Sequence, residues 1–256
     1  MDASERDPID AFAARLIEAR RSGRRIPRAQ AEAAGSDLTI GGAYGVQASV
    51  CRALGPARAF KTGRKALDLP VIVAPVLESG LRGDGAVFSA RELGGCGIEL
   101  EIGFRLDRPL PPVEAEDFAE RARGCVTPLP VIEIIDGRIE AFTELSDALK
   151  LADNQMNGGL VWAEPQADGA TPDFVQPVTD LRFDGRQIVS GPCPVPGGDA
   201  FDIFVAFARA IGDHCGGFQP GQIVTTGSLT GMLFVEPGTR IEGRIEGLGT
   251  ISVSYE

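Results

Sequence analysis

The spacing of apolar residues divides the chain into a helical beginning and a longer part rich in strands. Ile9, Phe12 and Leu16 recur at helical spacing and predict a helix over 7–21, and shorter helices are expected over 27–35 and 42–55. Beyond residue 55, short apolar segments are separated by glycine and proline, which is typical of strands and turns. The expected strands are 71–76, 86–89, 98–106, 130–135, 159–163, 174–179, 181–189, 222–226, 232–235 and 241–254, with helices over 114–124, 143–153 and 199–213.

This order of elements predicts an α+β fold. The strands are too many and too short for a doubly wound parallel sheet with alternating helices. No G-x-G-x-x-G follows a strand and there is no Walker sequence, so nucleotide-binding folds are not indicated. We expect a mixed β-sheet roll with a small N-terminal helical part, divided into a helical subdomain over 1–58 and a mixed-sheet catalytic domain over 59–256.

Composition and charge narrow the possible partners. The 256 residues include 25 basic and 36 acidic side chains, and the resulting net charge of −11 disfavours nucleic-acid binding. No apolar run has the length of a membrane-spanning helix and no signal-peptide core is present, so we expect a cytoplasmic protein without membrane contact. The densest basic run, Arg20 to Arg25, follows the first helix, and we interpret it as a helix C-terminus rather than an anion site.

Cysteine and histidine exclude several kinds of site. The five cysteines are scattered and never spaced as C-x-x-C, which argues against a disulfide framework and against structural zinc. The single histidine, His214, excludes zinc sites with two or three histidine ligands, and its position after a helical run is typical of a helix end.

The stretch "GIELEIGFRL" at 97–106 carries two carboxylates on one face of a predicted strand. Apolar residues alternate from Ile98 to Leu106, while Glu99 and Glu101 share the opposite face. Neighbours on one face of a strand lie about 7 Å apart, so the two charges repel each other. Either this face is wet and water screens the repulsion, or the two glutamates belong to a site.

A third carboxylate stands in an apolar strand. Glu133 lies within "VIEII", whose hydrophobicity predicts burial on both faces. A buried ionised carboxylate is costly unless a cation or hydrogen-bond donors compensate it. The partner is either an arginine such as Arg138 or a divalent ion shared with Glu99 and Glu101. Oxygen ligands without sulfur or imidazole select Mg²⁺, Mn²⁺ or Ca²⁺.

Two further segments carry candidate chemistry. Lys61, in "FKTGRK", can donate or accept a proton, and we expect its pKa to be lowered by burial and by a nearby cation. The turn "TTGSLTG" at 225–231 offers hydroxyls and backbone N–H groups suited to holding a carboxylate, although an ordinary hairpin connection reads the same way.

Six segments in order carry a family resemblance: "AYGVQ", "AFKTG", "IELEIGFRL", "LPVIEIIDGRI", "LADNQMNGGLVW" and "LTGMLFVEPG". Together they resemble the fumarylacetoacetate hydrolase superfamily, and within it the 2-keto-4-pentenoate hydratase branch, which also holds 4-oxalocrotonate decarboxylases. The resemblance implies a homo-oligomer with a rolled mixed β-fold of the fumarylacetoacetase C-terminal type. It also implies Mg²⁺ (or Mn²⁺) held by Glu99, Glu101 and Glu133, with Lys61 beside the metal and Asn154, Ser228 and Thr230 in contact with the substrate.

The activity that this resemblance implies is a lyase of aromatic-compound catabolism, a hydratase that adds water to a 2-hydroxy-2,4-dienoate or 2-oxo-enoate. Lys61, or an acid such as Glu78, would move protons. The chain departs from the family around the E-x-E strand, and it lacks an aspartate-rich stretch after Lys61, which leaves Glu78 or Asp84 as candidates for that acid. The alternatives are a 2-oxo-3-enedioate decarboxylase, an acylpyruvate hydrolase and a non-catalytic acidic binding protein. Hydrolysis is disfavoured because no histidine–acid dyad stands in the N-terminal region.

Overall fold

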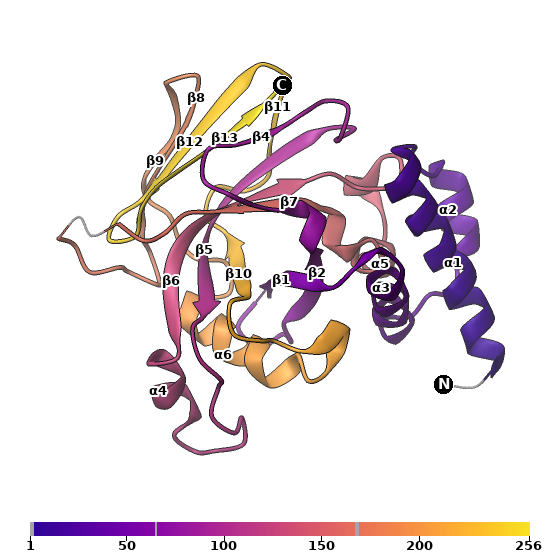
Figure 1. Cartoon of the computed structure of the whole chain (residues 1–256), viewed down its shortest axis with the longest axis horizontal. Helices are drawn as coiled ribbons and strands as arrows, with labels where there is room; N and C mark the ends of the chain where they lie inside the picture. The colour runs from indigo at the N-terminus through magenta and orange to yellow at the C-terminus, as the bar shows by residue number, and fades with distance from the viewer. Residues whose placement is uncertain (1–2, 65, 167–168) are drawn as a thin grey trace.

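Two mixed β-sheets form the body of the chain, with helices beside and below them (Figure 1). The computed structural model describes residues 3–64, 66–166 and 169–256. The α-helices are α1 (Ala3–Ser22), α2 (Arg28–Ala34), α3 (Ile40–Leu54), α4 (Phe118–Arg123), α5 (Asp147–Ala152) and α6 (Ala200–Ala210). The strands are β1 (Ala57–Gly63), β2 (Ile72–Leu77), β3 (Leu81–Gly83), β4 (Ala86–Phe88), β5 (Cys96–Leu106), β6 (Val126–Ile135), β7 (Asn157–Trp162), β8 (Val178–Phe183), β9 (Arg186–Pro192), β10 (Ile223–Ser228), β11 (Leu233–Val235), β12 (Thr239–Ile245) and β13 (Gly249–Tyr255).

The larger sheet curls into a roll. Its strand order is β2-β1-β10-β5-β6-β7-β3, with β11 paired to β5; β1 with β10 and β3 with β7 are parallel, and the other pairs are antiparallel. Strand β2, at one edge, contacts β7 near the opposite edge, so the sheet encloses an inner face. That face carries a small apolar cluster contributed by five strands: Ala59, Val76, Leu129, Val131, Leu160 and Ile223.

The main core lies between the outer face of the roll, the five-stranded sheet and α6. The smaller sheet has the order β4-β13-β12-β8-β9 and lies above the roll in Figure 1. Ile98, Leu100 and Ile102 of β5 belong to this core, and so do the phenylalanines of α6. Gly243 fits this packing, since a Cβ there would lie 2.8 Å from the Leu100 side chain. Helix α6 begins where the Asp199 carboxylate accepts hydrogen bonds from two backbone N–H groups.

The N-terminal helices pack beside the roll and share a core with later residues. Helices α1 and α3 contact each other, and α3 contacts α5. Their apolar cluster joins Phe12, Leu16 and Val46 to Ile135 and Leu149, so residues of the helical part pack against the end of β6 and against α5. The boundary expected at residue 58 stays a prediction.

The expectation of an α+β fold with mixed sheets is confirmed, but several strand predictions are wrong in detail. The strand expected over 181–189 is interrupted by a turn at Asp184 and Gly185, with the end of β8 before it and the start of β9 after it, and β3 was not expected. Strand β1 was not expected, because Lys61 and Thr62 interrupt the apolar pattern of "ARAFKTG". The segment 241–254 forms two strands instead of one, because the chain turns at Gly247, whose φ of 79° suits glycine. The strand expected over 174–179 begins only at Val178. No helix among the described residues has the length and apolar character needed to cross a membrane.

Candidate metal centre

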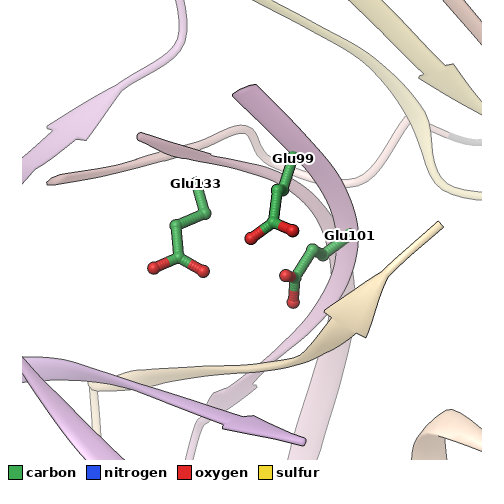
Figure 2. Close-up of side chains that lie close together, drawn as sticks. All are labelled: Glu99, Glu101 and Glu133. Atoms are coloured by element: carbon green, nitrogen blue, oxygen red, sulfur yellow. The ribbon is translucent and has the colours of Figure 1, made fainter. Parts of the chain in front are cut away.

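Two neighbouring strands bring three glutamates together on the inner face of the roll. In the antiparallel pair of β5 and β6, Glu99 lies directly opposite Glu133, and Glu101 follows two residues later on the same face. Figure 2 shows the three carboxyl groups turned toward one shared space. Each offers an oxygen, and these oxygens all lie within 4.8 Å of one another. We call Glu99, Glu101 and Glu133 the three-glutamate cluster.

Burial makes this cluster electrostatically costly. Glu133 is fully buried and Glu101 is 2% exposed, while Glu99 is partly exposed. Burial, followed by the charges of Glu133 and Glu99, raises the pKa of Glu101 to about 8. Burial also raises the pKa of Glu133 to about 7, although Lys61 acts in the opposite direction. The cluster therefore lacks positive charge, which a divalent cation would supply.

Lys61 is the cation that the fold places beside the cluster. Its Nζ lies 2.8 Å from Glu133 Oε1 and donates a hydrogen bond to the Gln155 carbonyl at 3.2 Å. Burial lowers the pKa of Lys61, but the charges of the three glutamates outweigh it, so the net direction is upward and not downward as expected. The alternative prediction, that Arg138 pairs with Glu133, is wrong. The Arg138 side chain binds the Asp153 carboxylate and the Asn157 carbonyl instead.

Two hydrogen bonds that orient the glutamates were not predicted from the sequence. Asn157 Nδ2 donates to Glu133 Oε1 at 2.8 Å, and the Gly227 backbone N–H donates to Glu101 Oε2 at 2.8 Å. The other oxygen of Glu133, Oε2, is buried and has no hydrogen-bond partner among the residues that the structure describes. An unpartnered buried carboxylate oxygen, next to two further carboxylates, fits a cation ligand, so the residues present suit a divalent metal.

The residues expected to bind substrate lie around this cluster, and they differ in whether their side chains already make hydrogen bonds. Ser228 is opposite Glu101 in the pairing of β10 with β5, and its buried Oγ makes no hydrogen bond within the described part of the chain. Asn154 donates through Nδ2 to the Pro75 carbonyl at 3.1 Å, while its buried Oδ1 accepts from no described residue. Thr230 is already engaged, since its Oγ1 accepts from the Leu100 N–H and donates to the Gly231 carbonyl, both at 3.2 Å.

The backbone that carries Asn154 is strained. Asn154, Gln155 and Met156 have φ values of 50°, 53° and 61°, in the left-handed region that non-glycine residues seldom adopt. Three such residues in succession place the Gln155 carbonyl on Lys61 and Asn157 on Glu133. Strain of this kind persists where the surrounding structure enforces it, often at functional sites.

The candidate acids between Lys61 and Glu99 lie at the surface instead. Glu78 is exposed, and its carboxylate accepts a hydrogen bond from Arg58 at 3.0 Å. Asp84 is exposed and accepts hydrogen bonds from the backbone and hydroxyl of Ser252. The structure therefore brings neither residue to the three-glutamate cluster. His214 lies in a short 3₁₀ turn, 2.8 Å from Gln47 Oε1, and is not part of the cluster.

Curated proteins of similar sequence are hydratases and a decarboxylase. The chain is 27% identical over 172 residues to 4-oxalocrotonate decarboxylase of a Pseudomonas species, and 30% identical over 175 residues to 2-keto-4-pentenoate hydratase 1 of Dechloromonas aromatica. These matches cover 62% and 68% of the chain, but only 64% and 65% of the relatives, slightly under two thirds of their length. The 2-keto-4-pentenoate hydratase of Burkholderia vietnamiensis matches at 25% identity over 98% of the chain and 99% of the relative. No protein-family model matches the chain.

Solved structures show the same fold. The chain superposes on 4-oxalocrotonate decarboxylase from Pseudomonas putida G7, complexed with magnesium and adipate, with a TM-score of 0.82, 20% identity and 98% of both chains covered. Fumarylpyruvate hydrolase from Pseudomonas aeruginosa, in complex with Mn²⁺ and pyruvate, gives a TM-score of 0.53 at 16% identity, over 79% of this chain and 90% of that one.

Proposed function

Because the chain belongs to the fumarylacetoacetate hydrolase superfamily, in the branch of the 2-keto-4-pentenoate hydratases and 4-oxalocrotonate decarboxylase, we propose that it is a divalent-metal-dependent carbon–oxygen lyase. The proposed reaction adds water to a 2-hydroxy-2,4-dienoate or a 2-oxo-enoate. The observation that carries this proposal is the three-glutamate cluster, buried on the inner face of the roll with Lys61 beside it.

The residues proposed to hold the metal are Glu99, Glu101 and Glu133. Their donor set consists of carboxylate oxygens alone, which favours Mg²⁺ or Mn²⁺. The bound ion would supply Lewis-acid stabilisation of the negative charge that develops on the substrate's 2-oxygen. Asn157 and the Gly227 N–H would keep two of the carboxylates oriented, as residues behind metal ligands commonly do.

Proton transfer is assigned to Lys61. Ketonisation of a 2-hydroxy-dienoate moves a proton from the hydroxyl oxygen to carbon, and water addition needs a further proton transfer at the alkene. Lys61 Nζ is the basic group within hydrogen-bond distance of the cluster, and its contacts with Glu133 Oε1 and the Gln155 carbonyl fix its position. We do not assign this role to Glu78, because its carboxylate is exposed and bound to Arg58.

Substrate polar groups would be held by side chains whose hydrogen-bonding capacity is unused. Ser228 Oγ can donate to a substrate carboxylate, and Asn154 Oδ1 can accept from a hydroxyl. Thr230 would act by holding the turn against the Leu100 N–H, which keeps Ser228 in place. We further propose that the protein is a cytoplasmic homo-oligomer. Light scattering of the purified protein measures the number of subunits.

The test follows the absorbance of 2-hydroxypenta-2,4-dienoate with purified protein and Mg²⁺. We expect metal-dependent loss of the dienoate and a product that has gained one water. EDTA should abolish the reaction, and Mg²⁺ or Mn²⁺ should restore it. Undiminished turnover by metal-free protein would contradict the proposed mechanism.

The second candidate is a decarboxylase, because one curated relative and a solved structure that superposes on nearly the whole chain are 4-oxalocrotonate decarboxylases. The same protein is therefore assayed with 4-oxalocrotonate. Release of CO₂ without gain of water identifies the decarboxylase, whereas paired acid products from an acylpyruvate identify a hydrolase. Absence of metal binding and of turnover would support a non-catalytic protein.

A further inference from the structure

A cavity of about 480 Å³ lies on the helical side of the roll. It is lined by the last turn of α1, the turn that follows, β3, the loop after β4 and the segment after β6. Lys61 and the three glutamates are not among its described lining residues. The cavity is therefore separate from the candidate metal centre, and the function proposed above does not account for it.

The cavity is strongly basic in an otherwise acidic protein. Seven arginines line it against two acidic residues, Glu92 and Asp136, an excess of five positive charges in a chain whose net charge is −11. Four of the seven come from the run Arg20 to Arg25, which the sequence alone suggested to be only a helix end. The fold adds Arg82, Arg91 and Arg138 from distant parts of the chain.

Two of these arginines, Arg20 and Arg138, are largely buried, and one carboxylate compensates the charge of both. Arg20 and Arg138 share a single carboxylate: Arg20 Nη2 and Arg138 Nε each lie 3.2 Å from Asp153 Oδ1. Burial, together with the charge of Arg138, lowers the pKa of Arg20 to about 10. Arg20 Nε is buried, and no residue that the structure describes accepts a hydrogen bond from it. Two guanidinium groups on one carboxylate leave a positive charge that an anion would stabilise.

The rim of the cavity carries unpaired cations. Arg21, Arg24 and Arg91 are exposed lining residues, and their side chains make no ion pair or hydrogen bond with any residue that the structure describes. By contrast, Arg25 is held by Asp136 at 2.6 Å and Arg82 by Glu92 at 2.8 Å. Free guanidinium groups from two segments thus surround an opening whose walls are already positive.

We propose that this cavity is a binding site for a small phosphate-bearing metabolite. A phosphate monoester presents three terminal oxygens and nearly two negative charges, so it can bind several guanidinium groups at once, each through two parallel hydrogen bonds. A carboxylate has one charge and two oxygens in a plane, and it satisfies fewer of them.

The test uses fructose 1,6-bisphosphate as the probe, titrated calorimetrically into the 256-residue chain with Mg²⁺ at low salt. The test variant is Arg21→Gln/Arg91→Gln, which removes two rim cations without touching the buried pairs. Arg138 is left intact, because it also bonds Asn157, the residue that holds Glu133. The matched control is Arg15→Gln/Arg186→Gln, which removes the same charge at two exposed, unpaired arginines outside the cavity.

We expect saturable binding of one bisphosphate per chain, weakened about tenfold or more in the test variant and changed less than about twofold in the control. Added salt should weaken the binding, and neutral fructose should give no heat of binding. No saturable binding to the unmodified protein overturns the proposal. An equal loss in the control variant also overturns it, since binding would then follow net charge alone. Tricarballylate, a tricarboxylate, should bind more weakly; equal or tighter binding would overturn the assignment to phosphate.

Discussion

Replacing Glu101 by glutamine tests whether the Glu101 carboxylate binds a metal ion or serves a structural ion pair. Glu101 is 2% exposed, it accepts a hydrogen bond from the Gly227 N–H, and its raised pKa of about 8 leaves it mostly protonated at neutral pH in the absence of metal. Glutamine has nearly the same shape and keeps an oxygen that can accept from Gly227. In the metal-free protein, Glu101→Gln therefore imitates the state that the native side chain already adopts.

The magnitudes follow from this comparison. Because burial and the neighbouring carboxylates raise the pKa of Glu101 to about 8, the protonated form predominates near pH 7, so the free energy of unfolding of the metal-free protein should change by less than about 1 kcal/mol. Metal affinity should respond differently. Loss of a group that only supports a ligand costs about 10- to 100-fold in affinity, so loss of a charged ligand should cost at least about 100-fold, or about 2.7 kcal/mol.

The assay combines calorimetric titration of Mn²⁺ with urea unfolding in the presence of EDTA. The matched control is Glu116→Gln, an exposed glutamate outside the cluster, for which neither quantity should change. If Glu101→Gln binds Mn²⁺ as tightly as the unmodified protein, Glu101 is not a ligand. If metal-free Glu101→Gln loses several kcal/mol of stability, the carboxylate serves a structural ion pair and the argument from its raised pKa fails.

Further outcomes follow from the same geometry. Lys61→Met should lower turnover about 100-fold or more without weakening metal affinity, since it removes the proposed proton-transfer group and a charge that would compete with the metal; weaker Mn²⁺ binding would contradict this. Asn157→Leu should weaken metal binding about 10- to 100-fold in the same titration, because Glu133 loses the donor that orients it. Ser228→Ala should raise KM about tenfold but leave the melting temperature unchanged, since the Ser228 hydroxyl makes no hydrogen bond with any described residue. The metal-free protein should lose stability as pH rises from about 4.5 to 8, because Glu101 and Glu133 hold protons when folded that they release when unfolded; urea unfolding in EDTA at several pH values measures this, and constant or rising stability would contradict it.

The sequence predicts those features of the site that depend on the pattern of polar and apolar residues within one strand. Alternation in "IELEIGFRL" places Glu99 and Glu101 on one face, and the apolar neighbours of Glu133 predict its burial. Alternation cannot tell whether the polar face of a strand meets water or the inside of a roll. That depends on the curl of the larger sheet, which strands far apart in the chain decide.

The residues that were missed depend on contacts between distant segments. Asn157 reaches Glu133 because β7 pairs with β6 and three left-handed residues precede it. The Gly227 N–H reaches Glu101 across a register shift between β10 and β5. No local pattern encodes either contact. Conversely, Glu78 is close to the lysine in sequence, but the short 3₁₀ turn at Glu78–Gly80 keeps it at the surface.

The site is indicated most clearly by charged residues at positions where the fold favours apolar side chains. An acidic residue within "VIEII" contradicts the pattern of a buried strand, and Lys61, the third residue from the end of β1, contradicts the apolar inner face of the roll. One lysine cannot neutralise three carboxylates, as the raised pKa values of Glu101 and Glu133 show. A fold selected for stability alone would fill these positions with apolar side chains, as it does at Val131 and Leu160 beside them. The unbalanced charge is therefore better explained by a cation that the three glutamates bind than by the packing of the roll.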